Sequence, residues 1–391
     1  MTVEGHCDAR FAGLKAELER QLESGNELGA SIVVNIDGTN VVDIWGGYAS
    51  ADHSRAWTKD TITNVWSSSK TVSALAVLVL ISRGLVDPDA PLSKYWPEFG
   101  AGVETTTAKT PVLVRHILSH TSGHSGWRSP MTVERLYDLD LATSLLASQE
   151  PFWEPGTASG YHSISMGHLI GGLVRRVTGQ SLGSFVAAEI AGPLGADWQL
   201  GARESDWARV ADLLPPPPSS LDFSKLDPES ATAKTFANPP LSAEMVHTPE
   251  WRAAELGAVN GHGNARSLAR ILSAVTLGGT VDGHRLLAPE VVERIFDVQA
   301  DGVDVVVGVA LCFGVGFGLA QGGTLTSVPF LPKGGKLCFW GGWGGSIVLM
   351  DLERKVTFSY VMNKMGDGIM GSEKTAAYVK AAYKALGVEG Y

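Results

Sequence analysis

Cysteine is scarce in this chain of 391 residues, which contains only Cys7, Cys312 and Cys338. An odd number of cysteines without the close spacing of a metal site disfavours a disulfide framework and a zinc site, and indicates reduced thiols in a reducing compartment. None of the three stands in a basic, polar stretch of the kind that activates a thiol, so we expect no cysteine nucleophile.

Basic charge is also scarce. The chain has 31 lysines and arginines against 41 aspartates and glutamates, a net charge of −10, which disfavours nucleic acid or an anionic membrane as the main partner. The N-terminus lacks a basic stretch followed by an apolar core, so we expect a cytoplasmic protein. The uncharged run from Val305 to Ala320 is shorter than the ~18–20 residues of a membrane span and is rich in glycine, which favours closely packed strands.

The order of apolar patterns predicts strands at both ends of the chain and helices between them. Residues 11–22 have helical spacing, and residues 30–46 read as a hairpin with Asp37-Gly38 in its turn. Later strands are expected at Val305–Val309, Leu311–Leu319, Lys336–Trp340, Ser346–Asp351 and Lys355–Met362, before a helix over Glu373–Leu386. Helices are expected at Val112–Ser119, Thr132–Leu139, Ser144–Ser148, Ser163–Val177, Leu182–Ile190, Ala265–Leu277 and Pro289–Phe296. This order predicts one sheet built from both termini, with a helical region inserted.

One apolar segment carries the main candidate for catalysis. Residues 64–81 predict a buried helix, because apolar residues cover nearly its whole circumference and Gly84 can end it. At its start, Ser67 and Lys70 are three residues apart and share one face. A buried lysine is pushed towards its neutral form, in which it can take the proton of a serine nucleophile. The backbone N–H of Ser67 can also stabilise an oxyanion.

Two further segments are expected near this serine. Tyr161 lies in the turn-rich segment 155–163, which leads into a helix at Ser163. Its phenol can act as a second base if a nearby ammonium lowers its pKa, or it can simply pack its ring and donate to a carbonyl. Residues 339–346 are dense in glycine and tryptophan, which suits either a binding wall with exposed N–H groups or a tight bend at a sheet edge.

In combination these motifs resemble the serine β-lactamases and penicillin-binding proteins, which share the order Ser67-x-x-Lys70, Tyr161-x-Ser163 and a glycine-rich strand near the C-terminus. The segments 117–123, 155–156, 260–270 and 351–355 agree with this resemblance. It covers nearly the whole chain and is strongest to the family VIII carboxylesterases, which have a class C β-lactamase fold.

The resemblance implies an α+β fold, in which an antiparallel sheet flanked by terminal helices carries a large, mostly helical insertion. Residues 1–66 and 300–391 would form a discontinuous α/β domain, and residues 67–299 the helical domain, with the active site at their interface. It also implies an acyl-enzyme on Ser67, with Lys70 and Tyr161 as the other catalytic residues. The backbone N–H groups of Ser67 and Trp343 would form the oxyanion hole, and neither a metal nor an organic cofactor is expected.

Two departures from the β-lactamase pattern indicate the substrate. Trp340-Gly341-Gly342 stands where a β-lactamase has Lys-Thr-Gly, and tryptophan cannot hold a substrate carboxylate. Ser163 stands in place of an asparagine and has a shorter hydrogen-bonding arm. These four residues are the expected substrate-binding residues, and small carboxylic esters are the expected substrates. Lys333-Gly334-Gly335 is a rival for the third motif, but it precedes a short strand.

Other motifs suggest different chemistry and are disfavoured. Gly179-Gln-Ser181-Leu-Gly183 fits the nucleophile elbow of α/β-hydrolases, but a helix precedes it where that elbow needs a strand, so Ser181 is expected to cap the next helix. His116, His120 and His124 are spaced four apart, but Thr121-Ser-Gly123 interrupts the helix that would align them as metal ligands. His162 remains an alternative general base.

Several alternatives stay open for the chain as a whole. The four prolines that follow Leu214 predict an extended segment, and the region from Leu213 to Pro240 is expected to form a lid or pocket wall, with a docking site for a proline-reading module as the alternative. The same scaffold can carry a β-lactamase, a peptidase, an amide hydrolase, an acyltransferase or an inactive binding protein. The sequence does not predict the oligomeric state.

Overall fold

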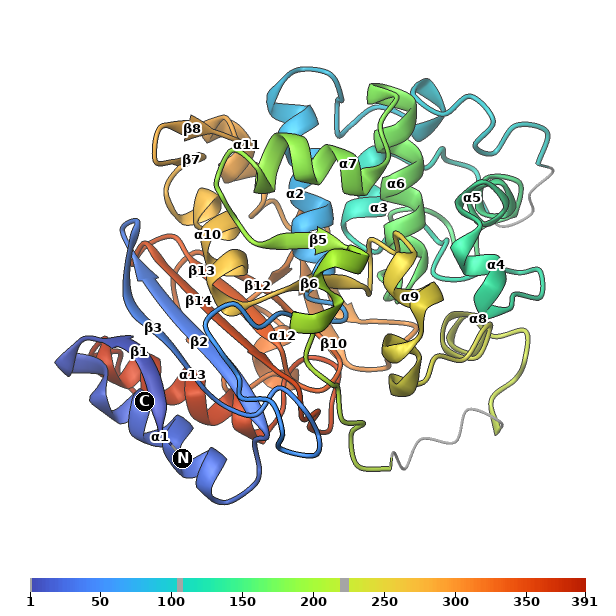
Figure 1. Ribbon diagram of the computed structural model, residues 1–391. Coiled ribbons are helices and arrows are strands. Elements are labelled where there is room, and N and C mark those ends of the chain that lie inside the picture. The colour runs from blue at the N-terminus through green and yellow to red at the C-terminus, as the bar shows by residue number, and fades with distance from the viewer. Residues whose placement is uncertain (1, 104–107, 219–224) are drawn as a thin grey trace.

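The core of the molecule is a nine-stranded antiparallel sheet. The computed structural model describes residues 2–103, 108–218 and 225–391. The strands follow the order β1-β3-β2-β14-β13-β12-β11-β10-β9 (Figure 1). They are β1 (Val3–Cys7), β2 (Gly29–Ile36), β3 (Thr39–Gly47), β9 (Ala300–Val303), β10 (Ala310–Phe313), β11 (Gly318–Leu319), β12 (Leu337–Gly341), β13 (Ile347–Asp351) and β14 (Val356–Met362). The expected sheet from both termini is confirmed, although β1 was not predicted.

Helices cover both faces of this sheet. The first helix, α1 (Ala12–Glu23), packs against the last, α13 (Glu373–Ala385), on one face (Figure 1). On the other face α10 (Ala265–Thr276) packs against β2, β13 and β14. The hairpin between β2 and β3 turns through Asp37 and Gly38, both at positive φ (48° and 89°), as expected for this dipeptide.

The region between β3 and β9 is mostly helical. Its remaining α-helices are α2 (Ser69–Ser82), α3 (Val114–Leu118), α4 (Val133–Tyr137), α5 (Leu139–Ala147), α6 (Ser165–Thr178), α7 (Leu182–Val186), α8 (Ala231–Phe236), α9 (Pro249–Ala253) and α11 (Pro289–Arg294). Short strands complete it: β4 (Thr63–Asn64), β5 (Trp198–Leu200) and β6 (Gly261–Gly263) in one sheet, and β7 (Thr280–Val281) with β8 (His284–Arg285) in another. α12 (Thr324–Ser327) lies later, between β11 and β12. The division into two domains at residues 66 and 300 stays a prediction.

The apolar helix α2 is buried, as its composition predicts. Its residues from Ser69 to Leu80 are all buried, and it ends before Gly84, which has a φ of 69°. The helix begins two residues after Ser67, which lies in the preceding turn together with Trp66, at a φ of 48°.

Two of the expected strands are wrong. Residues 305–309 form a turn, in which Gly308 has a φ of 73° and the Asp304 carboxylate accepts backbone N–H groups that a strand would use for pairing. The expected single strand Leu311–Leu319 is two strands, β10 and β11, which pair with each other around Gly316, at a φ of 94°. The valines of this segment favour a strand by propensity, but propensity takes no account of the Asp304 carboxylate, which accepts their N–H groups and forms a turn.

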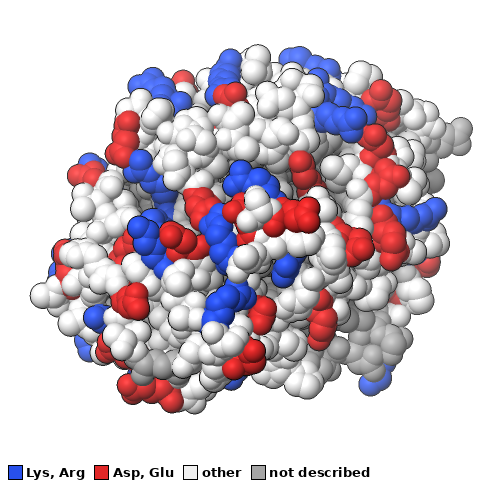
Figure 2. Space-filling view, viewed as in Figure 1, with Lys and Arg blue, Asp and Glu red and all other residues white. Residues whose placement is uncertain are grey.

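Charges of both signs intermix on the face shown in Figure 2 rather than gathering by sign. Ion pairs join many charged side chains, for example Arg209 with Asp197 and Arg266 with Asp43. In the described part of the chain, no helix combines the length and apolar character needed to cross a bilayer. The three cysteines are free thiols, as expected.

Candidate active site

Ser67 and Lys70 meet at the start of α2. The Nζ of Lys70 lies 3.1 Å from the Oγ of Ser67. The one-turn spacing that the sequence predicts therefore brings the two side chains into hydrogen-bond contact. Ser67 is 8% exposed and Lys70 is 2% exposed, so both residues are buried and the lysine is almost fully enclosed.

The amine of Lys70 is buried among carbonyl groups. It donates to the backbone oxygen of Ser163 at 2.6 Å and to that of Ala258 at 3.1 Å. Among the described residues, no carboxylate forms an ion pair with it. Burial therefore holds the pKa of Lys70 well below its usual value, because desolvation disfavours the charged form.

Tyr161 contacts the same hydroxyl from the other side. Its phenol donates to the Oγ of Ser67 at 2.8 Å. Burial raises the pKa of Tyr161 to about 12, so the condition under which Tyr161 could act as a second base, a lowered pKa, is not met. The amine of Lys70 lies 4.9 Å from the centre of the Tyr161 ring, and desolvation of the phenol is the main cause of the raised pKa. Tyr161 is therefore a neutral hydrogen-bond donor at neutral pH.

The glycine-rich segment after β12 lies directly against the serine. A Cβ on Gly342 would be 2.2 Å from the carbonyl oxygen of Val65 and 3.3 Å from the backbone nitrogen of Ser67. Only glycine permits so close an approach. Ser346 strengthens this contact, because its hydroxyl donates to the same carbonyl at 2.9 Å and lies 3.0 Å from the hydroxyl of Ser68.

Two backbone N–H groups at this junction are free. Among the residues that the structure describes, neither the N–H of Ser67 nor that of Trp343 donates a hydrogen bond. Trp343 directly follows Gly342, so the two groups lie close together. Free N–H groups at a helix start and at a strand end can donate to one oxygen that develops negative charge.

Trp340 belongs to an apolar cluster beside Tyr161. The two rings are 5.4 Å apart, and Val306, Leu311 and Phe313 complete the buried part of the cluster. Partly buried Trp153, Ala231, Phe236, Val307 and Met370 pack around it. Trp343 points elsewhere, with its ring against Trp66 at 5.0 Å. The structure therefore places Trp340, but not the indole of Trp343, in an apolar wall at the phenol.

Part of the region expected to form a lid or pocket wall reaches this cluster. Ala231 and Phe236 of α8 pack against it, and the hydroxyl of Thr232 donates to the carbonyl of Val306 at 3.1 Å. Residues 219–224 of the same region lie outside the described residues. Ser163, expected to bind substrate, contributes its carbonyl to Lys70, and α6 begins two residues after it rather than at it.

Two residues that hold this site together are not singled out by the sequence patterns: Asn260, which is only part of the matching segment 260–270, and Asp304. The side chain of Asn260 accepts from the N–H of Leu256 and donates to the carbonyls of Trp251, in α9, and of Ala254, directly after that helix. These bonds hold the backbone that presents the Ala258 carbonyl to Lys70. Asp304 accepts the backbone N–H of Tyr161 at 3.0 Å. A polar residue within an apolar run was the available signal for Asp304.

The disfavoured motifs have other partners. Ser181 accepts the N–H of Ser184 as the N-cap of α7 and donates to Glu255 at 2.9 Å, as expected for a cap. His162 lies 2.6 Å from the carbonyl of Gly160 and 2.6 Å from the hydroxyl of Ser122, so both of its ring nitrogens are engaged away from Ser67.

The three histidines of the possible metal motif also have separate contacts. Ring nitrogens of His116 and His120 accept the N–H groups of Leu113 and His162, and His124 lies 3.0 Å from the carbonyl of Ser122. Among the described residues, no group of three His, Cys, Asp or Glu side chains is arranged to hold a metal ion.

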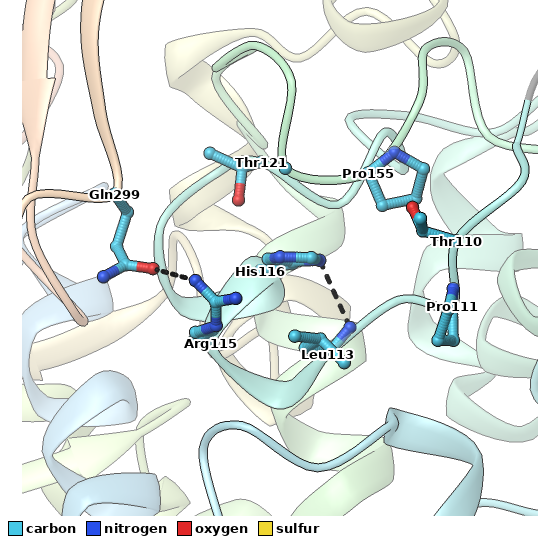
Figure 3. A pocket seen from close by; sticks show the side chains of 9 residues that line it. Thr110, Pro111, Leu113, Arg115, His116, Thr121, Pro155 and Gln299 are labelled. Carbon is cyan, nitrogen blue, oxygen red and sulfur yellow. Dashed lines mark hydrogen bonds between the residues drawn. The ribbon is translucent and has the colours of Figure 1, made fainter.

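A cavity of about 390 Å³ lies behind the loop that carries Tyr161, and it does not include Ser67. Arg115, His116 and Thr121 line one side and Pro155 the other (Figure 3). Ser67, Lys70 and Tyr161 are not among the residues that line it.

An α+β fold in which a Ser-x-x-Lys turn meets a tyrosine and a glycine-rich strand defines the β-lactamase-like class of proteins. The β-lactamase family model matches residues 14–382. The Mycobacterium tuberculosis protein described as esterase/beta-lactamase LipL is 31% identical over 374 residues, which cover 93% of this chain and 83% of that protein. The chain belongs to the β-lactamase family.

Solved structures agree with this assignment. The crystal structure of a family VIII carboxylesterase has a TM-score of 0.89 and 35% identity, covering 99% of this chain and 100% of that chain. A penicillin-binding protein homologue from Caulobacter crescentus has a TM-score of 0.89 and 32% identity, with coverage of 99% and 100%. The similarity that the motifs indicated, and the α+β fold that it implied, are confirmed.

Proposed function

We propose that this protein hydrolyses small, short-chain carboxylic esters through an acyl-enzyme on Ser67. The observation that carries the proposal is the double hydrogen bond at one hydroxyl: Ser67 Oγ lies 3.1 Å from the buried amine of Lys70 and 2.8 Å from the phenol of Tyr161. One neighbour can take a proton and the other can give one.

The enzyme is a serine hydrolase of carboxylic esters. Its membership of the β-lactamase family, its similarity to a protein described as an esterase and its similarity to a family VIII carboxylesterase support this class. We propose the following catalytic roles, which the geometry of the site supports.

Lys70 is the proposed base. A neutral amine has two N–H donors and one lone pair, and the two carbonyls around Lys70 match the two donors. The lone pair is then directed at the proton of Ser67. Transfer of that proton to Lys70 accompanies attack of Ser67 Oγ on the ester carbonyl. The free N–H groups of Ser67 and Trp343 stabilise the oxyanion, a contribution of about 2.7–4 kcal/mol for a donor of this kind.

The acyl-enzyme forms when the alcohol leaves. The alcohol oxygen receives a proton either from the Lys70 ammonium directly or from the Tyr161 hydroxyl. In the second case the Lys70 ammonium then passes to Tyr161 the proton that it took from Ser67. By either route Lys70 and Tyr161 both end neutral. In the second half of the reaction a water molecule gives its proton to the same base and attacks the acyl carbon. Ser67 regains its proton as the acid leaves. Every step uses side chains of the site, so the proposal needs neither a metal nor an organic cofactor.

Trp340, Gly341 and Gly342 are the proposed substrate wall, with Ser163 at its edge. The cluster around Trp340 is apolar, which favours uncharged acyl or alcohol groups over groups that carry a carboxylate. Partly buried Trp153 and Phe236 pack against this cluster, and their bulk favours short chains.

The proposal is tested by measuring hydrolysis of p-nitrophenyl esters of increasing chain length with the wild-type enzyme, Ser67→Ala and Ser181→Ala. Ser67→Ala should abolish turnover, whereas Ser181→Ala should keep most of it because Ser181 caps α7. Loss of activity in a folded Ser181→Ala variant would contradict the assignment of the nucleophile. Faster release of product with an added acceptor alcohol would reveal acyl transfer, and turnover of a β-lactam but not of esters would replace the proposed substrate.

A further inference from the structure

Asp304 is a buried carboxylate that holds the loop of Tyr161. It follows β9, is 0% exposed, and its Oδ1 accepts three backbone N–H groups, those of Tyr161, Val306 and Val307, each at 3.0 Å. Its Oδ2 has no hydrogen-bond partner among the described residues, and no cationic side chain there forms an ion pair with it. A buried polar atom without a hydrogen-bond partner is unfavourable, so an acidic side chain at this place requires an explanation.

The turn that Asp304 begins holds the same loop at two further points. The N–H of Val305 donates to the carbonyl of Ser159 at 2.9 Å. The side chain of Val306 packs in the apolar cluster that contains Tyr161 and Trp340. The turn itself is closed by hydrogen bonds from Asp304 to Val309 and from Gly308 to Asp304, at 2.9 and 2.8 Å. The backbone and the ring of Tyr161 are therefore fixed from one side by one rigid turn.

We propose that Asp304 is a positioning residue for Tyr161, whose backbone it fixes so that the phenol stays within hydrogen-bond distance of Ser67. This inference rests on the proposed function of Tyr161. The phenol reaches Ser67 from a loop rather than from a helix or strand, and the neighbouring N–H groups of Gly160 and His162 are held by His120, whereas the N–H of Tyr161 itself is held by Asp304. The hydrogen bond from the Tyr161 N–H to Asp304 is made by the backbone of the tyrosine itself. It therefore restrains the phenol more directly than a bond to a neighbouring residue would.

The alternative is that Asp304 only closes its turn. Whether Asp304 positions Tyr161 or only closes its turn, Asp304→Ala should be less stable than wild type. A measurement of stability therefore does not distinguish the two roles. They differ in whether the kinetic effect depends on the phenol, because two residues that act through one another have non-additive effects.

The experiment measures the acylation rate constant and KM for an alkyl acetate, whose alcohol must be protonated as it leaves, in a double-mutant cycle with Tyr161→Phe. Asp304→Ala should slow acylation by about 10- to 100-fold in the wild-type background, as expected for a displaced catalytic group, with a smaller change in KM. In the Tyr161→Phe background it should slow acylation less than about threefold, because the phenol is already absent. Asp304→Asn keeps an oxygen that can accept the three N–H bonds and should restore acylation to within about threefold of wild type.

Asp301→Ala is the matched control, because that carboxylate lies on the same hairpin and accepts the N–H of Gly323 instead. It should leave acylation unchanged. Asp304→Glu, which displaces the carboxylate by one methylene, provides the same cycle if Asp304→Ala does not fold.

An equal effect of Asp304→Ala in both backgrounds, or failure of Asp304→Asn to restore acylation, would overturn the inference alone. Wild-type acylation in Tyr161→Phe would instead overturn the proposed role of the tyrosine, and with it the inference.

Discussion

Replacing Lys70 with methionine keeps the length and apolar character of the side chain but removes its amine. If Lys70 is the base, acylation in Lys70→Met should fall by about 10²- to 10⁴-fold, the usual contribution of a positioned base. The wild-type acylation rate should rise with pH through the lowered pKa of Lys70, because only the neutral amine can accept the proton of Ser67. Stopped-flow measurements with an activated ester at several pH values give both quantities.

The same substitution has a predicted signature in stability. Burial lowers the pKa of Lys70 in the folded chain, so between the folded and unfolded pKa values the unfolded chain binds one more proton. The free energy of unfolding of the wild type therefore rises with pH across that interval, by up to about 1.4 kcal/mol per pH unit, and the penalty for burying the lysine vanishes above about pH 10.5.

From pH 7 to pH 9, the wild type should gain stability relative to Lys70→Met, by at most about 3 kcal/mol. The carbonyls of Ser163 and Ala258 lose their donor in the variant, but that loss does not depend on pH and cancels in the comparison. Urea denaturation of both proteins at the two pH values measures the difference. A gain below about 0.5 kcal/mol would mean that the pKa of Lys70 is not lowered across this range, and it would refute the reasoning.

Three further predictions concern other parts of the structure. Tyr161→Phe should slow release of an alkyl alcohol more than release of p-nitrophenol, because p-nitrophenol is the better leaving group and needs less protonation. Hydrolysis rates of alkyl esters and p-nitrophenyl esters measure the difference. Equal slowing of both would argue against proton donation by the phenol. Gly342→Ala should abolish most activity, because the added methyl would lie 2.2 Å from a carbonyl oxygen, whereas Gly13→Ala, which meets no atom within 4 Å, should keep full activity in the same assay. Lys374→Met leaves Glu27 buried without its 2.9 Å ion pair. It should lower the free energy of unfolding by about 3–5 kcal/mol with little change in kcat. A urea denaturation curve identical to that of the wild type would contradict this.

Local patterns predicted the parts of the fold that local interactions determine. The apolar circumference of α2 and the Gly84 that follows it predicted a buried helix and its end. The dipeptide Asp37-Gly38 predicted its hairpin. Spacing by three residues was enough to bring Ser67 and Lys70 together.

Local sequence patterns did not predict the contacts between residues far apart in the chain. The Ala258 carbonyl that accepts from Lys70 comes from a loop far along the chain, and its position depends on the side chain of Asn260. The valines after Asp304 have high strand propensity, but the carboxylate takes their N–H groups and makes a turn. The pKa of Tyr161 depends on how completely the phenol is desolvated, which no spacing in the sequence expresses.

The central claim is that Ser67 is the nucleophile of an acyl-enzyme. Its most direct test is the mass of the intact protein after brief exposure to an activated short-chain ester and, separately, to a serine-reactive phosphonate, followed by peptide mapping. A single adduct on Ser67 with each reagent is the predicted result. An adduct on Ser181, or no adduct with either reagent, would contradict it, the first by moving the chemistry to another serine and the second by indicating a binding protein of this fold.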